Sequence, residues 1–157
     1  MVQTIPVSSE DDAFLFDLYA DSRSTEMQTW GWDEAMIRSF LLMQWNAQKL
    51  SYAQQYPDSK QFLVVTEKMP VGRVIVSQTD KEIRLVDLII LSAYRNAGIG
   101  TSLLQQFQNE AFSTCLPVRL SVLKTNPAKE LYIRLGFRLI GENDMYDFME
   151  SGEPSKG

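Results

Sequence analysis

The residues best suited to chemistry in this sequence lie in a short loop that joins an apolar strand to a helix. Arg95 precedes two glycines, Gly98 and Gly100, and the apolar residues that follow recur every four positions, which predicts a helix from about Gly98 to about Ser113. Glycine has no Cβ atom, so a ligand can approach the backbone closely. The unpaired N–H groups of a first helical turn favour an anion, and an arginine adds a forked cation. The loop is therefore predicted to bind a diphosphate.

The pattern of the loop excludes two common diphosphate-binding motifs. No Lys-Ser or Lys-Thr follows the second glycine, as a nucleotide P-loop requires, and Leu103 stands where a dinucleotide fingerprint has its third glycine. The remaining pattern, Arg-x-x-Gly-x-Gly after an apolar strand, resembles the coenzyme A pyrophosphate loop of the GNAT superfamily of acyl-CoA-dependent N-acyltransferases. A tight strand-to-helix turn, with glycines needed only for packing, is the alternative interpretation.

A second segment extends the resemblance. Residues 117–122 predict a strand, and Asn126 then precedes a short helix that carries Tyr132 and ends before a Gly-Phe pair. This arrangement resembles the second signature of the superfamily, in the expected order and at the expected separation. The resemblance covers roughly residues 60 to 150, whereas the first sixty residues agree only in outline.

The resemblance implies an α/β fold of the α+β type: a mixed, mostly antiparallel sheet of about seven strands with helices on both faces. The predicted strands are 2–7, 62–66, 71–77, 82–91, 118–123, 137–141 and 145–150, and the main predicted helices follow Ser9, run from about Asp33 to Tyr56, and run from about Gly98 to Ser113. The first helix is expected to break between Arg23 and Trp32. One domain is expected over residues 1–157, with a polar, frayed tail from about Ser151.

The resemblance also implies where acetyl-CoA binds. Strands 82–91 and 118–123 would splay apart at the loop, and the pantetheine arm would lie between them. Backbone groups near the end of the first strand would hydrogen-bond the arm, and one N–H would polarise the thioester carbonyl, a contact whose loss typically costs about 3 kcal/mol. The residues implied in cofactor binding are Ile90, Leu91, Arg95, Asn96, Ala97, Gly98, Ile99, Gly100, Thr101 and Asn126.

Two side chains are implied in catalysis. Tyr132 matches the position of the usual general acid of the superfamily, and an aromatic residue packed on the core is the alternative. Asp87 is an acid in an otherwise apolar strand, which makes it a candidate general base or amine anchor. An ion pair with a strand arginine such as Arg73 is the alternative. Val86 stands where some polyamine-type relatives have an acid, so polyamine specificity is not inferred.

Charge and aromatic residues suggest the kind of acceptor. The net charge of −5 argues against nucleic acid as a partner and favours a cationic amine. Trp30 and Trp32 lie in the loop before the second predicted helix, where the superfamily commonly builds its acceptor site; core packing is the alternative. With Asp87, these residues predict a small cationic or aromatic-flanked primary amine, or a peptide amine, rather than an anionic acceptor.

Composition narrows the remaining possibilities. The absence of histidine excludes histidine-based triads and histidine metal sites, and no metal is expected. The one cysteine, Cys115, excludes an intrachain disulfide, agrees with a reducing cytoplasm, and is interpreted as a small packing residue. No apolar run approaches the roughly 20 residues that span a bilayer, and the N-terminus lacks a basic-then-apolar signal, so a cytoplasmic protein without membrane contact is expected.

These features together predict an N-acetyltransferase that transfers an acetyl group from acetyl-CoA to a primary amine by direct attack in a ternary complex. No covalent intermediate is expected, because Cys115 lies away from the motifs. A non-catalytic acyl-CoA-binding or regulatory domain of the same fold is the alternative, and Tyr132 favours the enzyme. Exposed strands in this superfamily often pair, so a homodimer is one assembly to expect.

Overall fold

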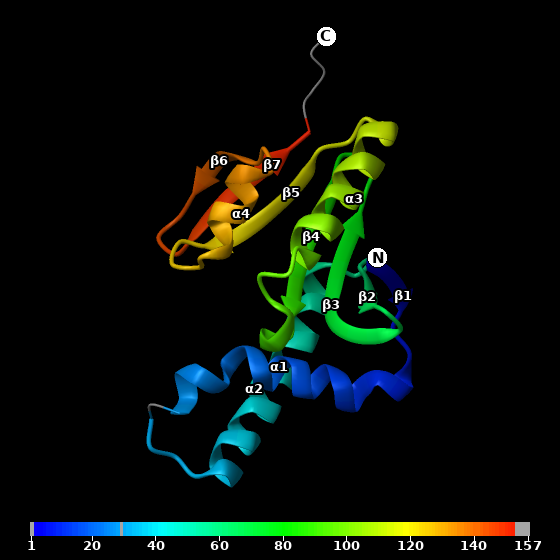
Figure 1. Ribbon diagram of the computed structural model, residues 1–157. Coiled ribbons are helices and arrows are strands. Elements are labelled where there is room, and N and C mark those ends of the chain that lie inside the picture. The colour runs from blue at the N-terminus through cyan, green and yellow to red at the C-terminus, as the bar shows by residue number, and fades with distance from the viewer. Residues whose placement is uncertain (1, 29, 153–157) are drawn as a thin grey trace.

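A single mixed sheet organises the computed structural model, which describes residues 2–28 and 30–152 (Figure 1). The described strands are ordered β1-β2-β3-β4-β5-β7-β6, and neighbours run antiparallel except for the parallel pair β4 and β5. The strands are β1 (Val2–Pro6), β2 (Lys60–Thr66), β3 (Met69–Gln78), β4 (Ile83–Ile90), β5 (Val118–Leu123), β6 (Arg138–Glu142) and β7 (Tyr146–Ser151). The helices are α1 (Asp12–Gln28), α2 (Glu34–Gln55), α3 (Ile99–Thr114) and α4 (Ala128–Arg134), with 3-10 turns η1 (Ser9–Asp11) and η2 (Ser92–Tyr94). The predicted fold class is confirmed.

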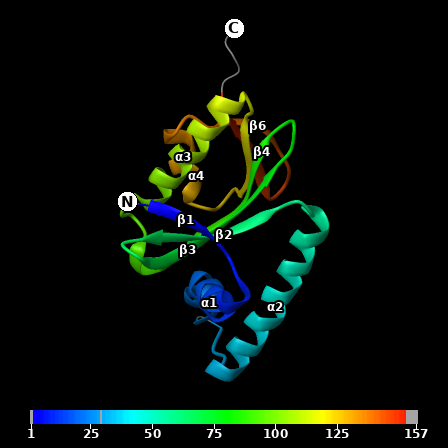
Figure 2. The same ribbon diagram turned by 90° about the vertical axis from the view of Figure 1, so that its right-hand side faces the viewer.

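Helices cover both faces of the sheet, so each face has its own apolar core (Figure 2). The core under α3 and α4 includes Leu103, Leu104 and Val74, which are fully buried. The core under α1 and α2 is smaller and is built around Trp45 and Leu63. No helix within the described residues is both long and apolar enough to cross a membrane.

Short-range signals set the ends of the two helices that frame the site. The Asp33 side chain accepts a hydrogen bond of 2.8 Å from the Met36 N–H and so begins α2. Gly98 begins α3 in the left-handed region, with a φ of 81°. Both helices lie within one or two residues of the predicted ranges.

The parallel strands β4 and β5 are joined only at their first residues. Their register pairs Ile83 with Val118 and ends where Leu85 lies opposite Leu120. Beyond that point β4 continues to Ile90 and β5 to Leu123 without pairing to each other. The structure therefore contains the predicted splayed strands.

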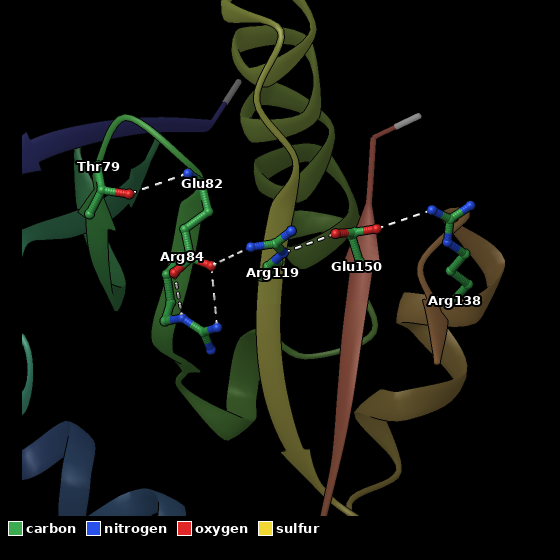
Figure 3. Close-up of polar contacts among 6 residues, drawn as sticks. All are labelled: Thr79, Glu82, Arg84, Arg119, Arg138 and Glu150. Carbon is green, nitrogen blue, oxygen red and sulfur yellow. Dashed lines mark hydrogen bonds and ion pairs between the residues drawn. The ribbon is translucent and has the colours of Figure 1, made fainter. Parts of the chain in front are cut away.

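A row of charged side chains fastens the base of this opening (Figure 3). Arg119 of β5 donates to Glu82, just before β4, at 3.2 Å, and to Glu150 of β7 at 2.9 Å. Glu150 also accepts from Arg138 of β6 at 3.0 Å. The row links four neighbouring strands on one face, so the two parallel strands stay together at one end and part at the other.

The ends of helix α1 and strand β7 can be compared with the sequence expectations. Helix α1 ends at Gln28, within the range from Arg23 to Trp32 where a break was expected, and Met27, which is 2% exposed, still belongs to the smaller core. Ser151 is not frayed: it ends β7 opposite Val118, is buried, and accepts a hydrogen bond from Gln108. The rest of the predicted tail, 153–157, lies outside the described residues.

The interpretation of Cys115 as a packing residue is also wrong. Cys115 is exposed, and it ends α3 in the left-handed region with a φ of 60°. At this C-cap position the chain turns away from the helix, so the side chain leaves the apolar stripe that the preceding turns bury.

Candidate active site

The start of α3 offers an open approach to backbone N–H groups. At Gly98 the positive φ favours glycine, and a Cβ atom there would meet nothing within 4 Å. Within the described residues no side chain caps this helix start, so the N–H groups of its first turn remain for a ligand. Asn96 and Ala97 are exposed beside it. The geometry fits an anion, because the helix dipole and free donors act at the same place.

The two glycines of the loop have different surroundings. Gly100 lies inside the first turn of α3, and a Cβ atom there would lie 3.5 Å from Leu131 Cδ2 of α4. Ile99 is 7% exposed and packs in the larger core, so only its backbone faces the loop, and Thr101 is half-buried on the same turn. Packing therefore requires a glycine at neither position, because a Cβ atom at Gly100 would make only an ordinary van der Waals contact and the space beside Gly98 is open.

Arg95 connects the loop to the neighbouring strand and helix through its side chain. Its Nε donates to the Ile90 carbonyl at 3.1 Å, and its Nη2 lies 4.0 Å from Asp21 Oδ2 of α1. Asp21 also accepts from the N–H and hydroxyl of Ser92, at 2.7 and 2.8 Å. The cation predicted beside the diphosphate thus ties the loop to β4 and α1 in this structure.

The backbone at the end of β4 presents one predicted donor to the opening. The Leu91 N–H donates to the Val71 carbonyl at 2.8 Å, so that group is already engaged with β3. In a paired strand the N–H and C=O of one residue lie on the same edge. Because the Ile90 carbonyl meets Arg95 and not β3, the Ile90 N–H lies on the edge that faces the opening.

The turn after β5 positions α4 on the other side of the opening. The Asn126 side-chain oxygen accepts from the Ala128 N–H at 2.9 Å and so holds the start of α4. Lys124 and Lys129, on either side of Asn126, both form ion pairs with Asp147 of β7. Hydrogen bonds from Lys129 and Lys124 lower the pKa of Asp147, and they fasten this turn to the sheet.

Tyr132 of α4 combines a buried ring with an unpaired hydroxyl. It is 9% exposed, and its ring meets that of Phe137 at a centroid distance of 5.6 Å. Burial, and then the negative charge of Asp87, raise its pKa to about 12. Among residues 2–28 and 30–152 its hydroxyl has no hydrogen-bond partner. The ring packs in the core as the alternative required, and the hydroxyl remains available as a donor.

Asp87 forms the ion pair that the sequence left as an alternative. Its Oδ2 accepts from Nη2 of Arg73, which is 3% exposed, whereas the Asp87 side chain is 22% exposed. Burial raises the pKa of Asp87, and the charge of Arg73 opposes that rise without cancelling it. The acid is therefore compensated, which removes the lone negative charge on which the preference for a cationic acceptor was based.

A β-bulge decides which face Asp87 occupies. Val76 of β3 lies opposite Leu85 and Ile75 opposite Asp87, so Val86 is an extra residue in β4. Leu85 packs in the larger core, and without the bulge Asp87, two residues later, would face the same side. The bulge turns Asp87 to the face covered by α1 and α2, and Leu88 takes the core position instead.

Comparison with known proteins identifies the family. A family model described as an acetyltransferase (GNAT) domain matches residues 58–139, just over half of the chain. The chain belongs to this family. It is thus an acyl-CoA-dependent N-acetyltransferase by membership. No curated protein sequence matches it significantly.

Solved structures agree on the fold. The PaiA N-acetyltransferase from Thermoplasma acidophilum, in complex with coenzyme A, is 19% identical with a TM-score of 0.72, over 98% of this chain and 99% of that one. The Campylobacter jejuni N-acetyltransferase PseH, in complex with acetyl coenzyme A, is 17% identical with a TM-score of 0.61, over 98% and 99%. The ribosomal-protein-S18-alanine N-acetyltransferase from Escherichia coli is 16% identical with a TM-score of 0.67, over 100% and 97%.

Tyrosines that sequence reasoning missed surround the Asp87–Arg73 pair of this acetyltransferase. Tyr19 of α1 and Tyr52 of α2 have pKa values raised by burial, and the charges of Asp87 and Arg73 act on both. The charge of Tyr146, in β7, also acts on Tyr52. Their spacing on separate elements carries no sequence signal, because only the packing of the helices on the sheet brings them together.

The two tryptophans proposed for the acceptor site form a cluster with Phe40 of α2. The ring centroids are 5.2 Å apart between Trp30 and Trp32, and 5.8 and 5.4 Å from each to Phe40. Trp30 is 43% exposed and Trp32 is 37% exposed. Packing of the three rings against one another accounts for the positions of both tryptophans. Both tryptophans also remain partly exposed, and their role in binding the acceptor stays a prediction.

Proposed function

We propose that this acetyltransferase moves an acetyl group from acetyl-CoA to a primary amine by direct attack within a ternary complex. One arrangement carries the proposal: β4 and β5 part beyond Leu85, the start of α3 has no side-chain cap, and Tyr132 lies near enough to Asp87 for the carboxylate charge to act on its hydroxyl. An anion site, a proton donor and a candidate base are the parts that acyl transfer to an amine requires.

The loop would hold the cofactor by its diphosphate. The N–H groups from about Asn96 to Thr101 would bind the phosphate oxygens, with close approach at Gly98, and Asn126 would meet the arm as it leaves the loop. Acetyl-CoA supplies the acetyl group as an activated thioester. The Ile90 N–H would donate to the thioester oxygen and stabilise the negative charge that develops there.

Tyr132 would act by donating a hydrogen bond to the departing sulfur. With a tyrosine pKa of about 12 and a thiol pKa near ~8.5, complete proton transfer is uphill by roughly 5 kcal/mol. A hydrogen bond to a charged partner contributes about 1.5–3 kcal/mol without that transfer. The raised pKa therefore favours hydrogen-bond donation over full acid catalysis.

Asp87 would receive the amine and assist its deprotonation. A lysine-like amine of pKa ~10.4 pays about 4.6 kcal/mol to lose its proton at pH 7, whereas an α-amine near ~8 pays about 1.4. Burial raises the pKa of Asp87, which makes the carboxylate a better base than an exposed one. A carboxylate is a weak base. An α-amine, which loses its proton more readily, therefore suits Asp87 better as an acceptor than a lysine side-chain amine does.

The test is an acetyl-CoA turnover screen against a chemically diverse amine library, which includes free amines and peptide amines. Thiol release that depends on an amine, with the acetylated amine identified by mass spectrometry, is the expected result. Tight binding of acetyl-CoA by calorimetry without transfer to any amine would instead indicate the regulatory domain.

The exposed thiol of Cys115 agrees with a reducing cytoplasm, which we propose as the location.

A further inference from the structure

A cavity of about 290 Å³ lies between α2 and strands β2 and β3, on the face that Asp87 occupies. The polar side chains that line it include Lys49, Tyr52, Gln61 and Arg73. Among the described residues that form its wall, none is acidic, although the whole chain carries a net charge of −5. Arg73 and several residues with hydroxyl and amide groups therefore line one space, and Lys49, whose Nζ lies 3.8 Å from the centroid of the Trp45 ring, adds a second positive charge to its wall, which favours an anionic ligand group.

Arg73 has bonding capacity that the protein does not use. Its side chain is 3% exposed; its Nη2 is paired with Asp87, but its Nε is buried without a hydrogen-bond partner. A buried guanidinium normally has its donors satisfied, because an unmade bond to a charged group is costly. A partly paired arginine at the wall of a polar cavity indicates that something else completes its contacts.

The same guanidinium links the cavity to the proposed amine position. Arg73 contacts Asp87 through Nη2 and is also one of the residues that line the cavity. An ammonium group beside Asp87 and a carboxylate beside Arg73 would lie only one guanidinium apart. This separation suits a small molecule in which the two groups are a few bonds from each other.

We propose that the cavity is a carboxylate subsite, and that the acceptor is a small zwitterion with a primary amine and a carboxylate, of the amino-acid type. The inference rests on the proposed function, which it deepens. A cavity of about 290 Å³ is at the lower end of ligand pockets, which suits a metabolite. It also replaces the expectation of a purely cationic acceptor, because Arg73 compensates Asp87.

The first measurement compares each amino acid with its own amide. L-phenylalanine and L-methionine are tested against L-phenylalaninamide and L-methioninamide at saturating acetyl-CoA. The amide keeps the amine and the side chain but removes the negative charge. The acid is expected to have at least a tenfold higher kcat/KM, which corresponds to about 1.4 kcal/mol. Because the amide has the less basic and more readily deprotonated amine, amine reactivity alone would give the opposite order.

The second measurement fills the cavity without touching Arg73 or Asp87. Ala53 of α2 lines the cavity and is itself exposed, so Ala53→Phe places a ring into the space. The matched control is Ala47→Phe, the same change at an exposed position of the same helix that is not part of the cavity wall. Ala53→Phe should raise KM for the amino acids at least tenfold, because the ring occupies the space proposed for the carboxylate, whereas Ala47→Phe should leave it unchanged. Thermal unfolding of both variants checks that the fold is kept.

The outcomes separate the subsite from the catalytic function. Equal use of acids and amides, or equal KM values in the two alanine variants, would overturn the subsite and leave the transferase intact. If no amine is acetylated, equilibrium binding of L-phenylalanine decides: binding that Ala53→Phe weakens and Ala47→Phe does not would support the subsite while the proposed reaction fails. Absence of both transfer and binding would overturn both.

Discussion

Replacement of Tyr132 by phenylalanine tests the proton donor with little disturbance of the fold. Phenylalanine keeps the ring contact with Phe137 and the place in the larger core, and removes only the hydroxyl. That hydroxyl has no partner within the described residues, so no buried group loses a hydrogen bond. The unfolding temperature and the affinity for acetyl-CoA should therefore stay near those of the parent.

The expected kinetic effect follows from the pKa of Tyr132. Since a pKa of about 12 disfavours full proton transfer to sulfur, the hydroxyl acts through a hydrogen bond of about 1.5–3 kcal/mol, which corresponds to a fall in kcat of roughly 10- to 150-fold. The raised pKa also predicts that Tyr132 stays protonated at neutral and moderately alkaline pH. Loss of activity at about pH 9 should thus be the same in parent and variant.

The assay is thiol release at saturating acetyl-CoA with the best acceptor from the amine screen. Single-turnover measurements establish that chemistry limits the rate, and calorimetry gives the affinity for coenzyme A. An unchanged kcat under these conditions would return Tyr132 to a purely structural role. An alkaline limb near pH 8 or 9 that disappears in the variant would refute the pKa argument.

Three further predictions concern the cofactor loop, the candidate base and the charged row. Gly98→Val should weaken coenzyme A binding at least tenfold, because the valine side chain enters the open approach to the loop. The control is Gly31→Val, at another left-handed glycine with free space (φ 73°), which should lose only about 1–2 kcal/mol of stability. Equal losses of coenzyme A affinity in the two variants, measured by calorimetry, would contradict the loop assignment. Asp87→Asn should remove or shift the acidic limb of kcat/KM, which lies above the ordinary carboxyl range of about 4 because burial raises the pKa of Asp87, and an unaltered pH profile would exclude the base role. Burial raises the pKa of Glu150, but hydrogen bonds from Arg119 and Arg138 outweigh that effect and lower the pKa overall. The ion pair between Arg119 and Glu150 therefore stabilises the fold above about pH 4.3, and its contribution is lost as the pH falls further. Arg119→Met should reduce that acid sensitivity by no more than about 1 kcal/mol, since the pair is partly exposed, and urea unfolding at pH 7 and pH 3 would show equal pH effects in both proteins if the reasoning is wrong.

Sequence alone determined the elements that are proposed to hold the cofactor, because each depends on neighbours along the chain. Four-residue spacing of apolar side chains defines α3, and Gly98 marks its start through its own backbone freedom. The strand at 118–123 and the short helix with Tyr132 follow from equally local patterns. Family resemblance added roles to these residues, and the family match confirms the membership on which those roles rest.

Only the tertiary structure decided how the proposed acceptor side of the site is built. Asp87 lies in a run that is apolar on both sides of it, so alternation could not show which face it takes. Its face is set by the bulge at Val86, which exists only because β3 offers one residue fewer than β4 at that point. The cavity beside Arg73 and Tyr52 is lined by residues of three separate elements, α2, β2 and β3. Such a site depends on strand register and helix packing, and no stretch of sequence contains either by itself.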